Sequence, residues 1–144
     1  MSSKKTFLEH ANISVPDIDE AIAFLQLVAP DFKVRKDDSS GEDPPRWVHF
    51  GNDESYIALQ AVDPKHHPKI WNRTYINYGI NHLAFVVSDF DAVATRLLQK
   101  GYRQGIAVEK SPYRKRAYFF DKAGFEWEIV EYLSEKPREK NRYT

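Results

Sequence analysis

The sequence predicts an α+β fold made of two tandem β-α-β-β-β modules, and three observations support this class. The segment LEHANISVPDIDEA, which begins at Leu8, recurs 72 residues later as INHLAFVVSDFDAV. The segment WVHFGNDESYIALQ, which begins at Trp47, recurs 70 residues later as AYFFDKAGFEWEIV. In both copies the apolar residues first follow the spacing of strands and then the spacing of an amphipathic helix.

The composition is that of a folded protein. Hydrophobic residues make up 42% of the 144 residues and aromatic residues 14%, which argues against disorder. Basic and acidic residues number 21 each, so the charge does not favour a nucleic-acid partner. The absence of cysteine excludes disulfides and thiolate metal sites, which leaves His, Asp, Glu and Gln as possible metal ligands. No apolar run reaches the length of a membrane span, and we expect a soluble cytoplasmic protein.

The whole chain, residues 1–144, is expected to form a single domain. Module one covers about 7–62, a linker about 63–79 and module two about 80–133, while 134–144 form a charged tail that is expected to be loose.

Each module is expected to form a strand, a helix and three further strands. In module one the helix is expected between Asp17 and Pro30, because aspartate favours helix starts and proline ends helices. In module two the helix is expected to begin at Ser88 or Asp91 and to end at Gly101, since glycine commonly follows a helix. The later strands are expected near FKVRK, RWVHF and SYIALQA in module one, and near RQGIAVE, RAYFF and EWEIVEY in module two.

Neither module can bury its sheet alone, so the two are expected to pair into one large curved sheet around a cleft, with the helices on the outer face. Side chains alternate between the two faces of a strand. When the apolar residues of three strands turn toward the helices, His10, His82 and Glu128 are left on the cleft face. These apolar residues are Ala11, Ile13, Val15, Leu83, Phe85, Val87, Trp127 and Ile129.

Two imidazoles and one carboxylate are a ligand set that divalent transition metals bind well. Three protein ligands leave coordination positions open for water or substrate, as in catalytic metal sites. We therefore predict a metal site at His10, His82 and Glu128, for which zinc, iron, manganese and nickel are all suitable ions.

Three motifs of the chain resemble those of the vicinal-oxygen-chelate superfamily, namely LEHANISVPDID, INHLAFVVSDFD and FFDKAGFEWEIVE. This superfamily includes glyoxalase I, methylmalonyl-CoA epimerase, extradiol dioxygenases and the fosfomycin- and bleomycin-resistance proteins. The resemblance extends from Phe7 to Leu133 and implies metal ligands at His10, His82 and Glu128. It also implies a homodimer, in which the cleft is often shared between the subunits.

The resemblance places the fourth metal ligand of glyoxalase I and the epimerase at Ala58, whose side chain cannot bind a metal. Gln60, two residues further along the same face, is the alternative fourth ligand. The three-ligand pattern is closer to the fosfomycin-resistance thiol transferases and the extradiol dioxygenases.

Further residues are predicted to act on the substrate. Glu128 is a catalytic candidate, and His49 either lines the cleft as an acid, base or hydrogen-bond partner or packs at the edge of a strand. A basic cluster either binds a substrate carboxylate or phosphate or forms a solvated turn, and it consists of Arg114, Lys115 and Arg116. Linker aromatic residues either cap the cleft or anchor the crossover, and these are Trp71, Tyr75 and Tyr78. The predicted substrate contacts are Trp47, Tyr56, Arg114, Arg116 and Tyr118.

The sequence thus leaves three functional hypotheses. The first is a metal-dependent enzyme that acts on a small oxygen-chelating substrate by Lewis-acid catalysis, in a lyase, isomerase, thiol-transferase or dioxygenase type of reaction. The second is a metal-free protein of bleomycin-resistance type that binds and sequesters a small molecule. The third is a ring-cleaving iron dioxygenase.

Overall fold

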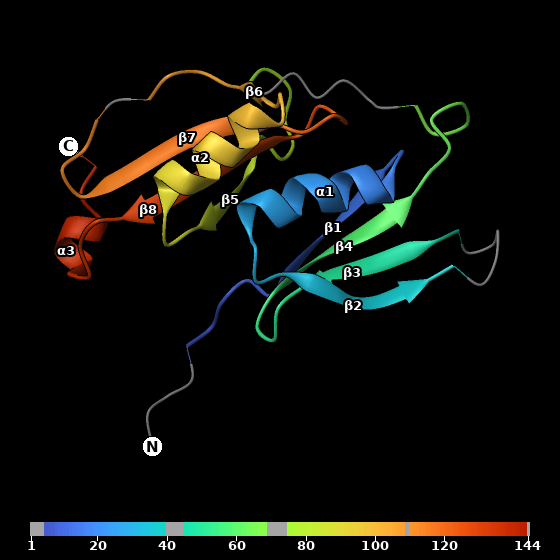
Figure 1. Cartoon of the computed structure of the whole chain (residues 1–144), viewed down its shortest axis with the longest axis horizontal. Coiled ribbons are helices and arrows are strands. Elements are labelled where there is room, and N and C mark those ends of the chain that lie inside the picture. The colour runs from blue at the N-terminus through green and yellow to red at the C-terminus, as the bar shows by residue number, and fades with distance from the viewer. Residues whose placement is uncertain (1–4, 40–44, 69–74, 109, 144) are drawn as a thin grey trace.

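The computed structural model describes residues 5–39, 45–68, 75–108 and 110–143 (Figure 1). Two modules follow each other along the chain, as the sequence predicts. Module one contains β1 (His10–Val15), α1 (Ile18–Val28), β2 (Lys33–Asp38), β3 (Trp47–Gly51) and β4 (Tyr56–Ala61). Module two contains β5 (Leu83–Val86), α2 (Phe90–Gln99), β6 (Arg103–Gln104), β7 (Arg114–Phe120) and β8 (Glu126–Tyr132), and α3 (Pro137–Lys140) follows it.

The strands form two four-stranded sheets of identical topology. Sheet A has the order β1-β4-β3-β2 and sheet B has the order β5-β8-β7-β6. In each sheet the first strand runs parallel to its neighbour and the remaining pairs are antiparallel. The predicted α+β class and the tandem modules are confirmed. Within one chain, however, the strands do not join into a single sheet, because β1 and β5 both remain edge strands.

Aspartate side chains set the start of both long helices. Asp17 accepts a hydrogen bond from the Glu20 backbone N–H at 3.1 Å, and Asp89 accepts one from the Ala92 N–H at 3.0 Å. The N-cap of α2 is therefore Asp89 rather than Ser88 or Asp91, since its carboxylate reaches the free N–H groups of the first turn.

One hydrophobic core contains residues of both modules. The ring of Trp127 on β8 lies 6.2 Å from that of Phe24 on α1 and 5.7 Å from that of Phe85 on β5. Phe32 continues this contact to Phe85 at 5.6 Å, and α1 packs against α2. The apolar sets expected to face the helices all belong to this core, completely or in part. The opposite face of each sheet, here called its open face, is thereby left for polar side chains.

Asp121 fixes the turn before β8. It is 9% exposed, and its carboxylate accepts hydrogen bonds from the Trp127 indole N–H and the Phe125 backbone N–H, both at 2.9 Å. This turn orients Trp127 in the core and so sets the register of the residues on either side of it, including Glu128.

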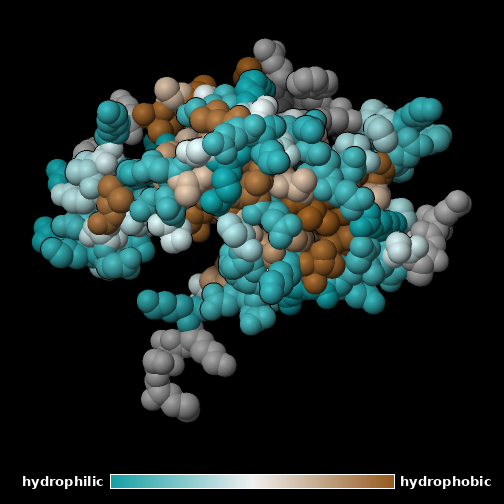
Figure 2. All heavy atoms as spheres, in the orientation of Figure 1, coloured by the Kyte–Doolittle hydropathy of each residue, from teal (hydrophilic) through white to brown (hydrophobic). Residues whose placement is uncertain are grey.

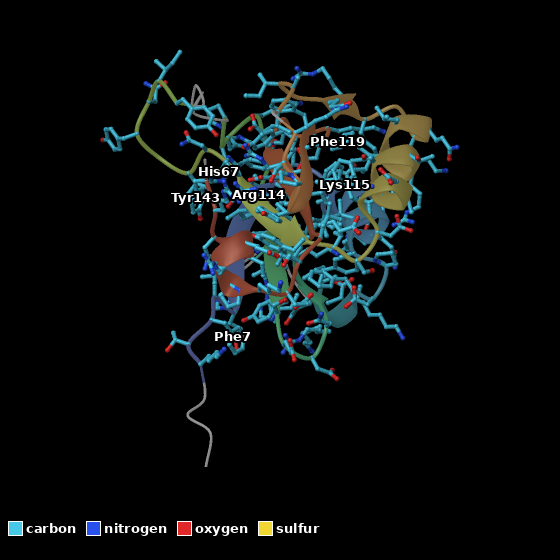
Figure 3. The ribbon with its side chains drawn as sticks, turned by 90° about the vertical axis from the view of Figure 1, so that its left-hand side faces the viewer. Phe7, His67, Arg114, Lys115, Phe119 and Tyr143 are labelled. Atoms are coloured by element: carbon cyan, nitrogen blue, oxygen red, sulfur yellow. The ribbon has the colours of Figure 1, made fainter. Side chains whose placement is uncertain are left out.

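The charged tail is more ordered than the sequence suggests. It forms the short helix α3, and Lys140 lies 4.7 Å from the centre of the Tyr132 ring. The guanidinium of Arg114 lies 5.1 Å from the centre of the Tyr143 ring, and Figure 3 shows the two side by side. These cation–π contacts hold the tail against the end of sheet B.

The face of the molecule seen in Figure 2 is mostly hydrophilic, with separate apolar patches. Among the residues that the structure describes, no helix combines the length and the hydropathy that a membrane crossing requires.

Candidate functional site

Sheet B brings together two of the three predicted metal ligands. Glu128 lies on β8 and is 9% exposed, and His82 lies directly before β5, the neighbouring parallel strand. The Nε2 atom of His82 is 3.0 Å from the Oε2 atom of Glu128. Strand alternation places Trp127 in the core and Glu128 on the open face of the sheet.

Arg116 and Tyr118 on β7 surround this pair. Arg116 Nη1 lies 3.4 Å from Glu128 Oε1 and donates to the Tyr118 hydroxyl at 3.2 Å. The Tyr118 ring meets the His82 ring edge-on, with the ring centres 5.0 Å apart. Burial, and then the negative charge of Glu128, raise the pKa of the Tyr118 hydroxyl above its usual value. Tyr118 therefore stays protonated and can donate a hydrogen bond.

The second ring nitrogen of His82 also has neighbours. The Tyr75 hydroxyl lies 3.2 Å from Nδ1, and the Oε1 atom of Glu126 lies 4.0 Å from the same nitrogen. Tyr75 comes from the linker, whereas Glu126 is the first residue of β8.

His10 lies on the open face of sheet A. Its Nδ1 atom is 2.9 Å from the Glu9 carboxylate, and its ring stacks on that of Tyr56 with the centres 4.6 Å apart and the planes 9° from parallel. In the part of the chain that the structure describes, Nε2 of His10 has no hydrogen-bond partner. The ring is thus held by two contacts while one nitrogen remains available.

The rings on sheet A form a continuous row. His49 stacks on Tyr56 with the centres 4.5 Å apart, Trp47 lies 4.8 Å from His49, and Arg35 lies 4.5 Å above the Tyr56 ring. Burial, and then the positive charges of Arg35 and His10, lower the pKa of His49 below its usual value. His49 is therefore neutral near pH 7 and can accept a proton.

The single chain therefore divides the predicted site into two halves. His82, Glu128, Arg116 and Tyr118 meet on sheet B, while His10, His49, Tyr56 and Trp47 meet on sheet A. Over the described ranges, no group of three His, Asp or Glu side chains is close enough to hold a metal ion.

Two other predicted residues have different surroundings, and a third lies outside the described residues. Arg114 lies on Tyr143 in the tail rather than beside Glu128. The Gln60 amide N–H₂ donates to the Pro45 carbonyl at 3.2 Å, a contact that orients this side chain toward the loop before β3. Trp71 lies outside the described residues, so its predicted role as a cap is not tested.

Sequence reasoning did not assign functions to Glu9, Glu126 or Arg35. Glu9 directly precedes His10, and Glu126 lies on the same face of β8 as Glu128. Both residues could therefore have been predicted from their positions in the sequence. Arg35 could not be found in this way, because an irregularity in the pairing of β2 with β3 falls between Val34 and Lys36.

A cavity of about 780 Å³ lies between the two edge strands. It is lined by His10 and Tyr56 on one side and by β5 and the start of α2 on the other, but neither His82 nor Glu128 lines it. The cavity therefore touches the sheet A half of the predicted site and not the group of side chains around Glu128 on sheet B.

Comparisons with known proteins agree on the family. The family model of the glyoxalase/bleomycin resistance protein/dioxygenase superfamily matches residues 7–129. A protein of Arabidopsis thaliana called glyoxylase I 4 is 28% identical over 126 residues, which are 86% of this chain and 70% of that protein.

Solved structures share the fold. A glyoxalase family protein from Bacillus cereus has a TM-score of 0.68 at 20% identity, covering 93% of this chain and 99% of its own. The fosfomycin resistance protein FosX from Listeria monocytogenes, in complex with Mn(II) and sulfate, has a TM-score of 0.66 at 17% identity and covers 96% and 100% of the two chains. With a family match over most of its length, this chain belongs to the glyoxalase/bleomycin resistance protein/dioxygenase superfamily.

Proposed function

We propose that this protein is a metal-dependent enzyme of its superfamily that acts on a small oxygen-chelating substrate. A divalent ion is held by His82 and Glu128 of one chain and by His10 of a second copy. The observation that carries the proposal is the 3.0 Å approach of His82 Nε2 to Glu128 Oε2 on sheet B, whose edge strand β5 pairs with β8 and with no other described strand.

The donor atoms fit a divalent transition metal. An imidazole nitrogen and a carboxylate oxygen lie side by side on sheet B, and His10 presents a second imidazole whose Nδ1 atom is held by a carboxylate. Ligating histidines usually have such a partner on their other nitrogen, because it fixes the ring and raises its basicity. When bound, the ion supplies Lewis acidity to vicinal substrate oxygens.

A homodimer supplies the missing ligand. Strands β1 and β5 occupy equivalent positions in the two modules, and neither has a partner on its outer side among the described strands. Exposed apolar side chains lie on or next to these edges, among them Leu8, Ile80 and Val86. Pairing β1 of one copy with β5 of another joins the open faces of sheets A and B, covers the unpaired edges and brings His10 toward His82 and Glu128.

The other polar residues of the two faces bind the substrate and move its proton. The Tyr118 hydroxyl and the Arg116 guanidinium lie beside Glu128, where they can hold the oxygens of an anionic substrate group. The neutral His49 accepts a proton from the substrate across the joined cleft. Trp47 and Tyr56 provide the aromatic wall beside it.

The comparisons support a metalloenzyme over a purely structural protein. One relative of the same fold was solved with Mn(II), and the Arabidopsis relative bears the name of glyoxylase I. Ala58 occupies the position predicted for a fourth ligand, so three protein ligands remain and the coordination sphere has room for a bidentate substrate.

The test is the metal content of Glu128→Ala. Protein purified without an affinity tag or chelators is dialysed against limiting Mn²⁺, Zn²⁺, Fe²⁺ or Ni²⁺ and measured by elemental analysis. The parent protein is expected to retain one ion per chain and Glu128→Ala to lose it, whereas the exposed control Glu54→Ala retains it. A Glu128→Ala protein that keeps a stoichiometric ion would show that the ligand assignment is wrong.

A second candidate, a metal-free binding protein, is favoured by one observation. Arg116 already forms an ion pair with Glu128, so the carboxylate does not require a metal to neutralise it. This protein would bind an aromatic or cationic compound with Trp47 and Tyr56. Parent protein that takes up none of the four ions, but whose tryptophan fluorescence is quenched by such compounds in a saturable way, would favour this candidate.

A further inference from the structure

The two histidines of the repeat have different partners on their Nδ1 atoms. In module one this partner is the carboxylate of Glu9, the residue directly before His10. The corresponding residue in module two is Asn81, directly before His82. Among the described residues no carboxylate lies within hydrogen-bond distance of Nδ1 of His82, and the Glu126 carboxylate is 4.0 Å away. The repeat alone therefore leaves the second histidine without the support that the first one has.

The linker supplies the missing support. Asn81 accepts a hydrogen bond from the backbone N–H of Tyr75 at 2.9 Å, and the Tyr75 hydroxyl lies 3.2 Å from Nδ1 of His82. Asn81 thus brings in a side chain from outside both modules that occupies the place of the Glu9 carboxylate.

The conformation of Tyr75 is not explained by burial. Tyr75 is 63% exposed, and with a φ of 65° it is the one residue other than glycine with a positive φ in the described ranges. A left-handed backbone is rarely adopted by residues with a side chain and persists only where the surroundings hold it. The hydrogen-bonding contacts that Tyr75 makes within the described residues are those to Asn81 and His82.

We propose that Tyr75 is a positioning residue for the site, whose hydroxyl fixes the His82 ring so that Nε2 faces Glu128 and a bound metal ion. This inference rests on the metal site put forward under the proposed function. Without a metal, the hydroxyl donates to Nδ1 while the Nε2–H donates to Glu128. When Nε2 binds a metal, the ring proton resides on Nδ1 and the same hydroxyl accepts it.

A hydroxyl suits this change of the ring proton from Nε2 to Nδ1 better than a carboxylate does. It can act as donor or acceptor, so His82 keeps its orientation in both states, whereas a carboxylate can only accept. The two histidines thus have different partners on Nδ1. His10 has the carboxylate of Glu9, whereas His82 has the Tyr75 hydroxyl, which can either donate or accept a hydrogen bond.

The test compares Tyr75→Phe with Tyr78→Phe, a linker tyrosine that is fully exposed. Mn²⁺ affinity is measured by isothermal titration calorimetry, and unfolding temperature by calorimetry of the metal-free proteins. Tyr75→Phe is expected to weaken Mn²⁺ binding about 10- to 100-fold, as the loss of an outer partner of a ligating histidine typically does. Tyr78→Phe is expected to bind as the parent does, and neither change should lower the unfolding temperature.

A spectroscopic measurement separates positioning from general stability. In Co²⁺-loaded protein the Nδ1–H protons of ligating histidines give paramagnetically shifted NMR signals. One of the two signals, that of His82, should exchange with D₂O faster in Tyr75→Phe than in the parent, while the other, that of His10, is unchanged. Equal Mn²⁺ affinities and equal exchange rates in Tyr75→Phe and the parent would overturn the positioning role while leaving the metal site intact. If the parent protein binds no ion, the proposed function itself fails, and the positioning role fails with it.

Discussion

Complementation between two inactive variants tests whether the metal site is shared between chains. His10→Ala removes the ligand on sheet A, and Glu128→Ala removes one on sheet B. Each variant alone is expected to lack tight metal sites, because every site in its homodimer lacks one ligand. The two proteins are mixed in equal amounts, exchanged under mild denaturant and returned to native buffer.

The expected recovery follows from the division of ligands between the sheets. Random exchange makes about half of the dimers mixed, and each mixed dimer contains one site with all three ligands and one site with two removed. About one quarter of the parent's metal capacity should therefore return. If each chain built its own site, every chain in the mixture would still lack a ligand, and no capacity would return.

The control mixes the parent with the double variant His10→Ala/Glu128→Ala. In a shared-site dimer the mixed species has no complete site, so only parent homodimers bind, and about one quarter of the capacity remains. In a single-chain site, every parent chain binds, and about half remains. Elemental analysis of the exchanged mixtures measures both ratios. Zero recovery in the first mixture together with one half in the second would refute the shared site.

Three further predictions concern stability. Asp121→Ala should cost about 1–3 kcal/mol of unfolding free energy in urea, because it leaves the buried Trp127 indole N–H without its acceptor; an unchanged urea midpoint would contradict this. Tyr102→Phe removes a 2.6 Å hydrogen bond to Glu20 and should cost about 0.5–1.5 kcal/mol in the same assay, while an increase in stability would argue that the buried hydroxyl is a net cost. Burial and two positive neighbours lower the pKa of His49 in the folded protein. As the pH drops below about 6.5, His49 therefore takes up a proton in the unfolded chain before it does so in the folded protein, and the free energy of unfolding should fall. His49→Gln should flatten this pH dependence, which unfolding curves between about pH 5 and 8 would measure; an equally steep dependence in the variant would assign the effect to another group.

The fold could be predicted from the sequence because the same pattern of strand and helix spacing occurs in both modules. His10 aligns with His82, and the alternation around each correctly separates core residues such as Val15 and Trp127 from polar residues on the open face. Both the number of strands and their order of appearance follow from this pattern. The predicted start of α2 was wrong by one or two residues, because the carboxylate of Asp89, and not Ser88 or Asp91, caps the helix.

The arrangement of the site was less predictable, because the repeat specifies modules but not how they pair. Whether β1 meets β5 of the same chain or of another depends on the linker and on the core around Phe24 and Trp127, which local patterns do not describe. The contact of Tyr75 with His82 joins a linker residue to a strand through an irregular backbone, so no periodicity could have revealed it.

Strand β8 also bears on how this protein could acquire new activities. Its residues alternate between a core that contains Trp127 and Ile129 and an open face that contains Glu126 and Glu128. Evolution can therefore replace the open-face side chains one at a time while the packing beneath them is preserved. Such a separation of foldability from chemistry explains how a single architecture can diversify into many catalysts and binders.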